Sequence, residues 1–266
     1  LVAVGTGSME LGATSVTEVG LREREICLEF NQAVTGLRMN NAWIRPGGTA
    51  TDLPDNGMDL LRDLIARMED NLHELSEFTL QNPIFKSRMK GIARMELAQC
   101  MALGITGPTL RATGLPWDLR KTNPYIGYEN YEFDVPTADT ADCYGRFVIR
   151  LEEMNQSVRI LKQVVKKLED PQGQRHMVDD PHIAWPAELA IGPDGQGNSH
   201  EHIKHIMGES MEALIHHFKV ITEGFKVPVG EVYQSIEGVA GELGCHLVSD
   251  GGVRPYRAHI RDTGFI

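Results

Sequence analysis

The sequence has no closely spaced cysteines: its four, Cys27, Cys100, Cys143 and Cys245, are scattered along the chain. Zinc and iron–sulfur sites are normally held by cysteines a few residues apart, so a metal cluster bound by this chain alone is disfavoured. No apolar run approaches the roughly 18 residues that a membrane span needs. A net charge of −11 also leaves the chain without the basic surface that binds nucleic acid.

Nucleotide-binding and hydrolase motifs are missing as well. The glycines of Gly104–Pro108 and Gly47–Gly48 form neither a phosphate-binding loop nor a dinucleotide fingerprint, because neither segment opens a strand–turn–helix unit at the required spacing. There is no GxSxG nucleophile elbow. The sequence therefore predicts no nucleotide site and no serine hydrolase in this chain.

The pattern that is present is mainly helical. A helix is expected from about Met9 to Thr35, and apolar residues spaced by three and four predict another over Leu61–Leu75 that stops at Asn82–Pro83. The same spacing over Leu151–Leu168 predicts the longest helix of the chain. A further helix is expected from a cap at Asn198–Ser199 to Ile221.

Between these helices, Leu103–Val135 is rich in glycine, proline and aromatic residues and has no clear period. A loop of this length inside a compact domain is usually functional or interfacial. We therefore expect an ordered loop with short turns that contributes to a site or an interface.

After Pro228 the pattern changes to short strands, expected at Glu231–Ile236, Cys245–Val248 and Tyr256–Ile260, with Gly238–Gly244 as the first turn. The predicted fold class is thus mainly α with a small antiparallel β-sheet near the C-terminus (α+β). We expect one domain over residues 1–266, with a helical body over 1–224 and the sheet region over 225–266.

One segment could hold a metal ion; it contains His200, Glu201, His202, His205 and Glu209. Residues three or four apart share a helix face, so pairs within it could act together. The run narrowly misses the HExxH pattern of zinc proteases, because Lys204 stands where the second histidine is required. A polar helix face is the favoured interpretation, and metal binding is the alternative.

Glu10 is the most unusual single carboxylate, since it lies in an otherwise uncharged run from Gly5 to Ala13. Burial among such neighbours would raise its pKa and suit it to proton handling. An exposed glutamate at a helix start is the alternative.

Motifs along almost the whole chain, from Thr6 to Phe265, carry a resemblance to a known family. In chain order they are Arg22-Glu23-Arg24-Glu25, Gly36-Leu37-Arg38-Met39, Arg45-Pro46-Gly47-Gly48, Ile105–Lys121, Tyr131–Pro136, Asp142–Arg146, Arg150–Met154, Leu247–Gly252 and Arg254–Arg257. They resemble the D subunit family of bacterial NADH–quinone oxidoreductases, the respiratory complex I. The chain starts at Leu1 and stops directly after a strand-like run, so we expect an interior fragment that lacks both natural ends.

The resemblance implies a fold like that of the nickel–iron hydrogenase large subunit without its metal-binding cysteines. It implies the quinone-binding subunit of a proton-pumping NADH:quinone oxidoreductase, without a complete active site in this chain alone. The expected substrate is a quinone, menaquinone or ubiquinone, held at the interface with an iron–sulfur subunit that carries a 4Fe–4S cluster. The expected partners are the iron–sulfur B subunit, the C subunit and the membrane H subunit of complex I. The expected location is peripheral, on the cytoplasmic side of the cell inner membrane.

Residue by residue, the resemblance assigns few roles. Thr6–Ala13 matches the family's Thr-His-x-x-Asp-x-Gly-Ala stretch, which implies quinone binding by Thr6 and Glu10. Glu10 replaces an aspartate that pairs with a quinone-binding histidine, and Gly7 replaces the histidine of the stretch. The family's headgroup ligands, a histidine and a tyrosine, fall upstream of Leu1.

Asn40 and Arg45 are implied to lie near the partner's iron–sulfur cluster. Many relatives carry a histidine at the position of Asn40, and asparagine cannot titrate. We therefore hypothesise a cluster of lower potential and a quinone of lower potential, such as menaquinone. Val239-Ala240 stands where relatives usually carry proline and a basic residue, so the contact made by that basic side chain is not implied for this chain.

Two alternatives remain open at this point. One is the large subunit of a related membrane-bound hydrogenase, or of a complex fed by another electron donor. The other is a non-catalytic scaffold that kept the fold and lost the quinone site.

Overall fold

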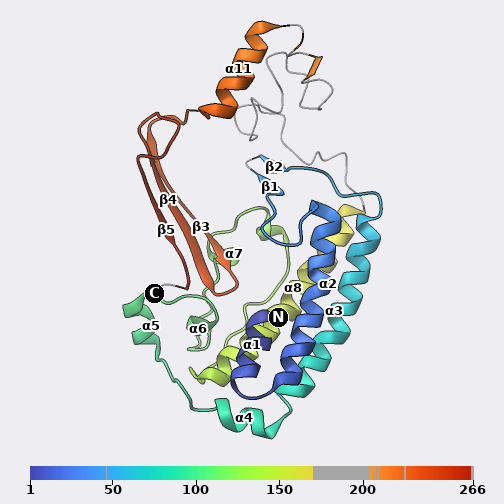
Figure 1. Cartoon of the computed structure of the whole chain (residues 1–266). Coiled ribbons are helices and arrows are strands. Elements are labelled where there is room, and N and C mark those ends of the chain that lie inside the picture. The colour runs from blue at the N-terminus through green and yellow to red at the C-terminus, as the bar shows by residue number, and fades with distance from the viewer. Residues whose placement is uncertain (46, 170–203, 206–207, 209, 225, 265–266) are drawn as a thin grey trace.

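The computed structural model describes residues 1–45, 47–169, 204–205, 208, 210–224 and 226–264. It is an α+β structure in which a body of long helices lies beside a small antiparallel sheet (Figure 1). The helices and strands in chain order are α1 (Val2–Glu10), α2 (Thr14–Thr35), β1 (Ile44–Arg45), β2 (Gly48–Thr49), α3 (Gly57–Thr79), α4 (Pro83–Met89), α5 (Leu97–Leu103), α6 (Pro108–Arg111), α7 (Leu119–Thr122), η1 (Tyr128–Asn130), α8 (Cys143–Leu168), α11 (Met211–Thr222), β3 (Gly230–Gly238), β4 (Gly241–Ser249) and β5 (Arg257–Arg261).

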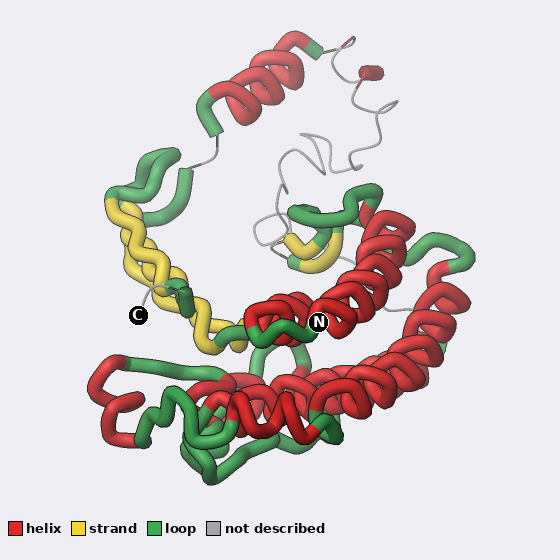
Figure 2. The backbone as a smooth tube through the Cα atoms, turned by 60° about the horizontal axis from the view of Figure 1, so that its bottom comes forward, coloured by secondary structure: helices red, strands yellow, loops and turns green. Residues whose placement is uncertain are grey.

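The helical body is built on α2, α3 and α8, which run side by side along most of their length (Figure 2). The apolar stripe predicted for α3 is confirmed: the residues that carried it are buried, namely Leu61, Ile65, Met68, Leu72 and Leu75. The first four of these residues share one core cluster with Val158 and Val165 of α8. Leu75 belongs to a second cluster, with Val4 and Phe147.

The first predicted helix is corrected to two. Residues 2–10 are already helical, and the break falls at Leu11–Ala13, where Gly12 takes a φ of +86°. Small residues allow α1 to fold back closely onto α2, since a Cβ atom on Gly5 would lie 3.5 Å from the Cα of Thr17. The run Gly5-Thr6-Gly7-Ser8 consists of weak helix formers, so tertiary packing decides its conformation.

The predicted end of α3 at Asn82–Pro83 is also corrected. The helix ends at Thr79, and Asn82 caps α4 by accepting hydrogen bonds from the backbone N–H groups of Ile84 (2.9 Å) and Phe85 (3.3 Å). Proline at the first helical position loses no hydrogen bond, because that N–H has no partner in a helix.

The long segment Leu103–Val135 is an ordered loop with short turns, as expected: it contains only α6, α7 and η1 after α5. Among the described helices α8 is the longest, as predicted, although it begins eight residues before Leu151. It begins there because Asp142 accepts a hydrogen bond from Gly145 N–H at 2.8 Å and caps the helix.

The C-terminal sheet has the order β3-β4-β5, with both pairs antiparallel. The turn predicted over Gly238–Gly244 is too long: Gly238 pairs with Gly241, so only two residues form the turn and β4 starts at Gly241. The third strand lies within one residue of its predicted bounds.

Two predictions fall partly outside the described residues. The expected cap at Asn198–Ser199 lies there. The single helix predicted up to Ile221 is corrected where it is described: Ser210 is not helical, and α11 begins only at Met211. Of the histidine-rich segment only His205 is described. Among the described residues, no helix is both long enough and apolar enough to cross a membrane.

Candidate functional site

Thr6 and Glu10 lie one turn apart on α1, and both side chains are exposed. The hydroxyl of Thr6 donates a hydrogen bond to the carbonyl oxygen of Val2 at 2.8 Å. Val4 and Ser8 occupy the opposite, buried face of this helix. The prediction that Glu10 is buried is therefore wrong for this chain. Uncharged residues such as Val4 and Ser8 form the buried face of α1, and the side chain of Glu10 is exposed at the end of the helix.

Asn40 and Arg45 lie at the other end of α2. Asn40 is exposed and has a φ of +54°, a left-handed conformation that asparagine tolerates better than most residues. The backbone of Arg45 pairs with Gly48 in the β1–β2 hairpin. Since α2 has 22 residues, these two positions and Glu10 are separated by a helix of about 33 Å at 1.5 Å per residue.

A buried charge network, which no sequence pattern assigned, lies between α6, α8 and the tip of the β3–β4 hairpin. At its centre, the guanidinium of Arg111 binds Glu153 (Nη2 to Oε1, 2.5 Å) and Glu237 (Nη1 to Oε1, 2.8 Å). Nη1 also donates to the carbonyl oxygen of Trp117 at 3.0 Å. The side chains of Arg111 and Glu237 are only 2% and 3% exposed. Burial works against the charge of Arg111, but the two carboxylates raise its pKa above the ordinary value.

A second arginine extends this network. Arg120 pairs with Asp118 (Nη2 to Oδ2, 2.7 Å) and stacks over the ring of Phe133 at 4.8 Å. Burial opposes the ionisation of Asp118, yet its hydrogen bonds to Arg120 and the arginine charge lower its pKa. Each buried charge here thus has a partner of opposite sign, as burial requires.

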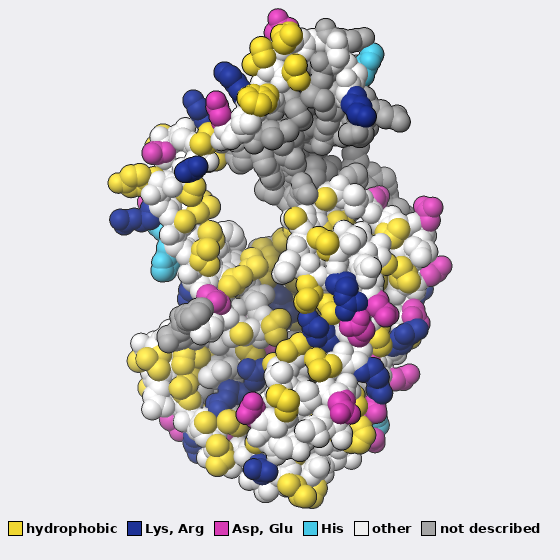
Figure 3. Space-filling model, in the orientation of Figure 1, with side chains coloured by type: hydrophobic (Ala, Val, Ile, Leu, Met, Phe, Trp, Pro, Cys, Tyr) yellow, Lys and Arg dark blue, Asp and Glu magenta, His cyan; other side chains and the backbone are white. Residues whose placement is uncertain are grey.

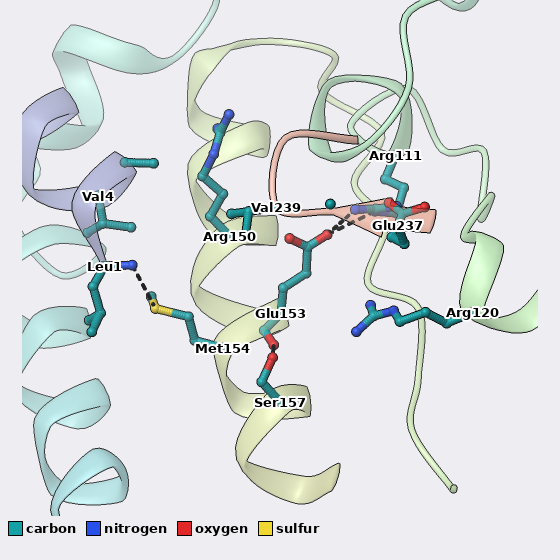
Figure 4. Close-up of a pocket in the computed structure, with 12 residues that line it drawn as sticks. Leu1, Val4, Arg111, Arg120, Arg150, Glu153, Met154, Ser157, Glu237 and Val239 are labelled. Atoms are coloured by element: carbon teal, nitrogen blue, oxygen red, sulfur yellow. Dashed lines mark hydrogen bonds and ion pairs between the residues drawn. The ribbon is translucent and has the colours of Figure 1, made fainter. Parts of the chain in front are cut away.

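Beside this network is a cavity of about 240 Å³. Figure 4 shows Arg111 and Arg120 on one side, the start of α1 on the other, and Arg150 and Glu153 of α8 between them. The lining residues are Leu1, Ala3, Val4, Arg111, Arg120, Arg150, Glu153, Met154, Ser157, Glu237, Gly238 and Val239. Arg150 is half-buried and donates one hydrogen bond, at 3.4 Å, to the carbonyl oxygen of Arg146.

The hairpin tip is fixed against the loop by two hydrogen bonds and one close backbone approach. The hydroxyl of Thr106 accepts a hydrogen bond from Glu242 N–H at 2.9 Å. Gly107, with a φ of +71°, lies so close that a Cβ atom on it would be 2.6 Å from the Cα of Gly241. Arg261 completes the attachment, donating to the Gly104 carbonyl oxygen at 2.6 Å. The hairpin is therefore held rigidly next to the cavity.

The signal for this network was present in the sequence, but it was incomplete. Arg111, Asp118 and Arg120 all lie in the Ile105–Lys121 motif, and Glu153 lies in the Arg150–Met154 motif. The motifs themselves do not show that these side chains contact one another in the fold. Within the described residues, no group of three or more histidine, cysteine, aspartate or glutamate side chains is placed to hold a metal ion.

The class of protein follows from comparison of the sequence with known families. The chain belongs to the family of the 49 kDa subunit of the respiratory-chain NADH dehydrogenase, whose family model matches residues 10–266.

Individual relatives agree with that family. The chain is 76% identical to the NADH-quinone oxidoreductase D subunit of Cutibacterium acnes over 266 residues, which are all of this chain and 61% of the relative. It is 59% identical to the D subunit numbered 2 of Streptomyces coelicolor and 57% identical to the D subunit of a Nocardioides species, covering 60% and 59% of their lengths. The chain thus spans about three fifths of the curated relatives it matches.

Proposed function

We propose that the protein is the quinone-binding subunit of a proton-pumping NADH:quinone oxidoreductase. The observation that carries the proposal is the match of the family along residues 10–266, together with relatives named as the D subunit of that enzyme at up to 76% identity. The large-subunit fold of nickel–iron hydrogenases and the organisation of residues 1–266 as one domain belong to the same proposal.

In the proposed enzyme, the quinone binds at the interface with the iron–sulfur B subunit, whose 4Fe–4S cluster supplies electrons. The C subunit and the membrane H subunit are the further partners, and the assembly lies on the cytoplasmic side of the inner membrane. Reduction of a quinone to a quinol takes up two electrons and two protons. This chain binds and orients the quinone, and provides charged groups that influence proton transfer.

Thr6 and Glu10 are proposed to face the quinone pocket. Their shared, exposed face on α1 supports this role, because side chains not used in the core of this chain are free to contact another segment or subunit. Once covered, the carboxylate of Glu10 would be desolvated beside a histidine and would favour the protonated form of that histidine. Glu10 is thus a positioning residue for a proton donor.

Asn40 and Arg45 are proposed to lie near the cluster of the B subunit. Their separation from Glu10 along α2 supports two distinct regions, one for the cluster and one for proton handling. Because Asn40 cannot bind a proton, reduction of the cluster should not be coupled to protonation at this position. A cluster potential that shifts with pH as in histidine-bearing relatives would contradict this assignment.

The experiment is NADH-driven quinone reduction by the intact, cluster-loaded assembly carrying Glu10→Gln. We expect turnover to fall by about 10-fold or more, since tuning a general acid affects part of its 10²–10⁴-fold contribution. Glu18→Gln, an exposed glutamate on the neighbouring helix α2, is the matched control and should leave turnover unchanged.

The outcomes separate the alternatives. Normal turnover of Glu10→Gln would mean that Glu10 has only a structural role. No NADH-linked turnover by the wild-type assembly would instead favour another electron donor, a related hydrogenase or a non-catalytic scaffold.

A further inference from the structure

The three-stranded sheet has one polar and one apolar face. Its register sets Val232 opposite Leu247, and Cys245 opposite Ile260. Directly opposed residues project to the same side of a sheet, and alternate residues share that side. The apolar sheet face, as we call it, therefore consists of Val232, Gln234, Ile236, Leu243, Cys245, Leu247, Ala258 and Ile260.

The polar face is largely satisfied within the chain. On it, the hydroxyl of Tyr233 donates to Glu242 at 2.9 Å, and His246 Nε2 lies 2.6 Å from the carboxylate of Glu231. This face also supplies Glu237 to the buried charge network. The polar side chains named here thus have partners within the chain, whereas the apolar face is exposed to solvent.

The apolar sheet face is open as far as the described residues are concerned. Ile260 is 68% exposed, Val232 58% and Leu247 37%. At strand spacings of about 4.8 Å and rises of about 3.3 Å per residue, the face presents on the order of 300 Å². This area is comparable to the largest apolar patch on a typical monomer, and such a patch is often functional.

The shape around the face suits an added layer. Figure 3 shows an open hollow between the sheet and the helical body, with hydrophobic side chains along both borders. At the end of the sheet away from the body, the apolar sheet face runs into a groove of about 500 Å³ that includes Val232 and Leu247. Apolar side chains from Val227, Val229, Val253 and Pro255 complete the groove.

We propose that the apolar sheet face is covered by a segment of the same polypeptide that lies outside residues 1–266, with apolar residues at helix or strand spacing. We infer the occupant from the length of the relative that is 76% identical to this chain. All of this chain aligns with that relative, but the alignment covers only 61% of the relative's length. More than a third of the relative's chain therefore has no counterpart in residues 1–266. A tethered segment also binds at a high effective concentration, which favours it over a separate partner.

The direct test is a photo-crosslinking amino acid, benzoylphenylalanine, placed at Val232 in the complete polypeptide expressed without other subunits. We expect an internal adduct with a peptide outside residues 1–266. The same probe at Tyr233, the next residue on the polar face, is the matched control and should not give that adduct. A product at the mass of a dimer, an adduct that forms only after other subunits are added, or no adduct would each overturn the proposal.

A second measurement uses Cys245, a native thiol on the apolar sheet face. In the complete polypeptide we expect its alkylation to be much slower in the native state than in denaturant. Leu247→Lys should remove this protection, whereas His246→Lys, adjacent but on the polar face, should keep it. Fast native alkylation of wild-type Cys245 would contradict the proposal even if the lysine variants fail to fold. Neither measurement depends on quinone chemistry, so failure here leaves the proposed function untouched.

Discussion

Arg111 and Glu237 are 126 residues apart in the sequence, yet their Nη1 and Oε1 atoms lie 2.8 Å apart in a buried ion pair. The pair joins the motif-bearing loop to the C-terminal hairpin. Because Arg111 also binds Glu153 of α8, one guanidinium connects three regions that are distant in the sequence.

Removing this guanidinium should strongly lower the free energy of unfolding of the subunit. Arg111→Met leaves the carboxylates of Glu153 and Glu237 without their cation, and breaking a buried pair in this way costs about 3–5 kcal/mol of unfolding free energy. Urea unfolding of the subunit would measure the loss. Arg159→Met, which removes an exposed pair with Asp134, should cost about 1 kcal/mol or less.

A double variant tests the cause. If stranded charge is responsible, Arg111→Met combined with Glu237→Gln should be more stable than Arg111→Met alone, because one unpaired carboxylate is gone. A double variant that is less stable than the single one would point to lost packing instead.

Gly107→Ala should detach the hairpin from the loop. The backbone here (φ +71°, ψ −150°) lies in a region that essentially only glycine adopts, and a side chain there costs about 1–3 kcal/mol. The new Cβ atom would also collide with the backbone of Ala240 and Gly241. We expect a total loss above about 2 kcal/mol and faster hydrogen exchange in β3 and β4.

Gly7→Ala is the matched control for that substitution. Nothing lies within 4 Å of a Cβ atom at Gly7, which is in the helix α1. Alanine should raise the stability there by about 0.5–1 kcal/mol. Equal losses from the two glycine variants would contradict the role given to the Gly107 contact.

The stability of the subunit in acid should depend on Asp142. Burial opposes the ionisation of this carboxylate, but hydrogen bonds from Gly145 N–H, Gly91 N–H and the hydroxyl of Thr140 outweigh it and lower its pKa below the ordinary 3.8. A carboxyl whose folded pKa is lowered stabilises the fold above its unfolded value. That contribution is lost as the pH falls from about 3.8 through the folded pKa.

In Asp142→Asn the free energy of unfolding should fall less steeply as the pH is lowered. The helix cap should remain, since asparagine caps a helix as well as aspartate does. Asp142→Ala should lose the cap too, at about 0.5–2 kcal/mol at neutral pH. Unfolding curves between about pH 2.5 and 7 would separate the two. If the loss of stability at low pH is the same in Asp142→Asn as in the wild type, the pH dependence comes from another carboxylate.

Leu75 is the most enclosed apolar residue of α3, with no exposed surface. Leu75→Ala should cost about 2–5 kcal/mol, from lost burial and the cavity left behind. Leu21→Ala, at a position 47% exposed on α2, should cost less than about 1 kcal/mol. Thermal unfolding of both variants would test whether the core lies where the structure places it.

The long helices were predictable because their apolar residues repeat at the helical period and face one core. The spacing of Leu61, Ile65 and Met68 carries that information locally. The start of β4 was not predictable, because Gly241 and Gly244 read as turn residues. Gly244 is glycine for a reason of packing: a Cβ atom there would be 2.9 Å from the ring of Tyr233.

The candidate site was only partly predictable. The family resemblance pointed to Thr6 and Glu10, but the exposure of Glu10 depends on which residues of α1 face α2, and no local pattern shows this. The charge network was out of reach for the same reason. Its residues belong to motifs that are recognisable one by one, while their meeting depends on how α8 and the hairpin pack around Arg111.

Met154 of α8 packs against both core clusters, one with Leu72 and Val158 and the other with Leu75 and Phe147. Neither cluster can therefore come apart without disturbing the same turn of α8. Melting of the helical body should then be cooperative, with a single transition in place of two independent ones. A side chain that must fit two cores at once has to adapt to both, and the unbranched, flexible methionine suits such a shared position.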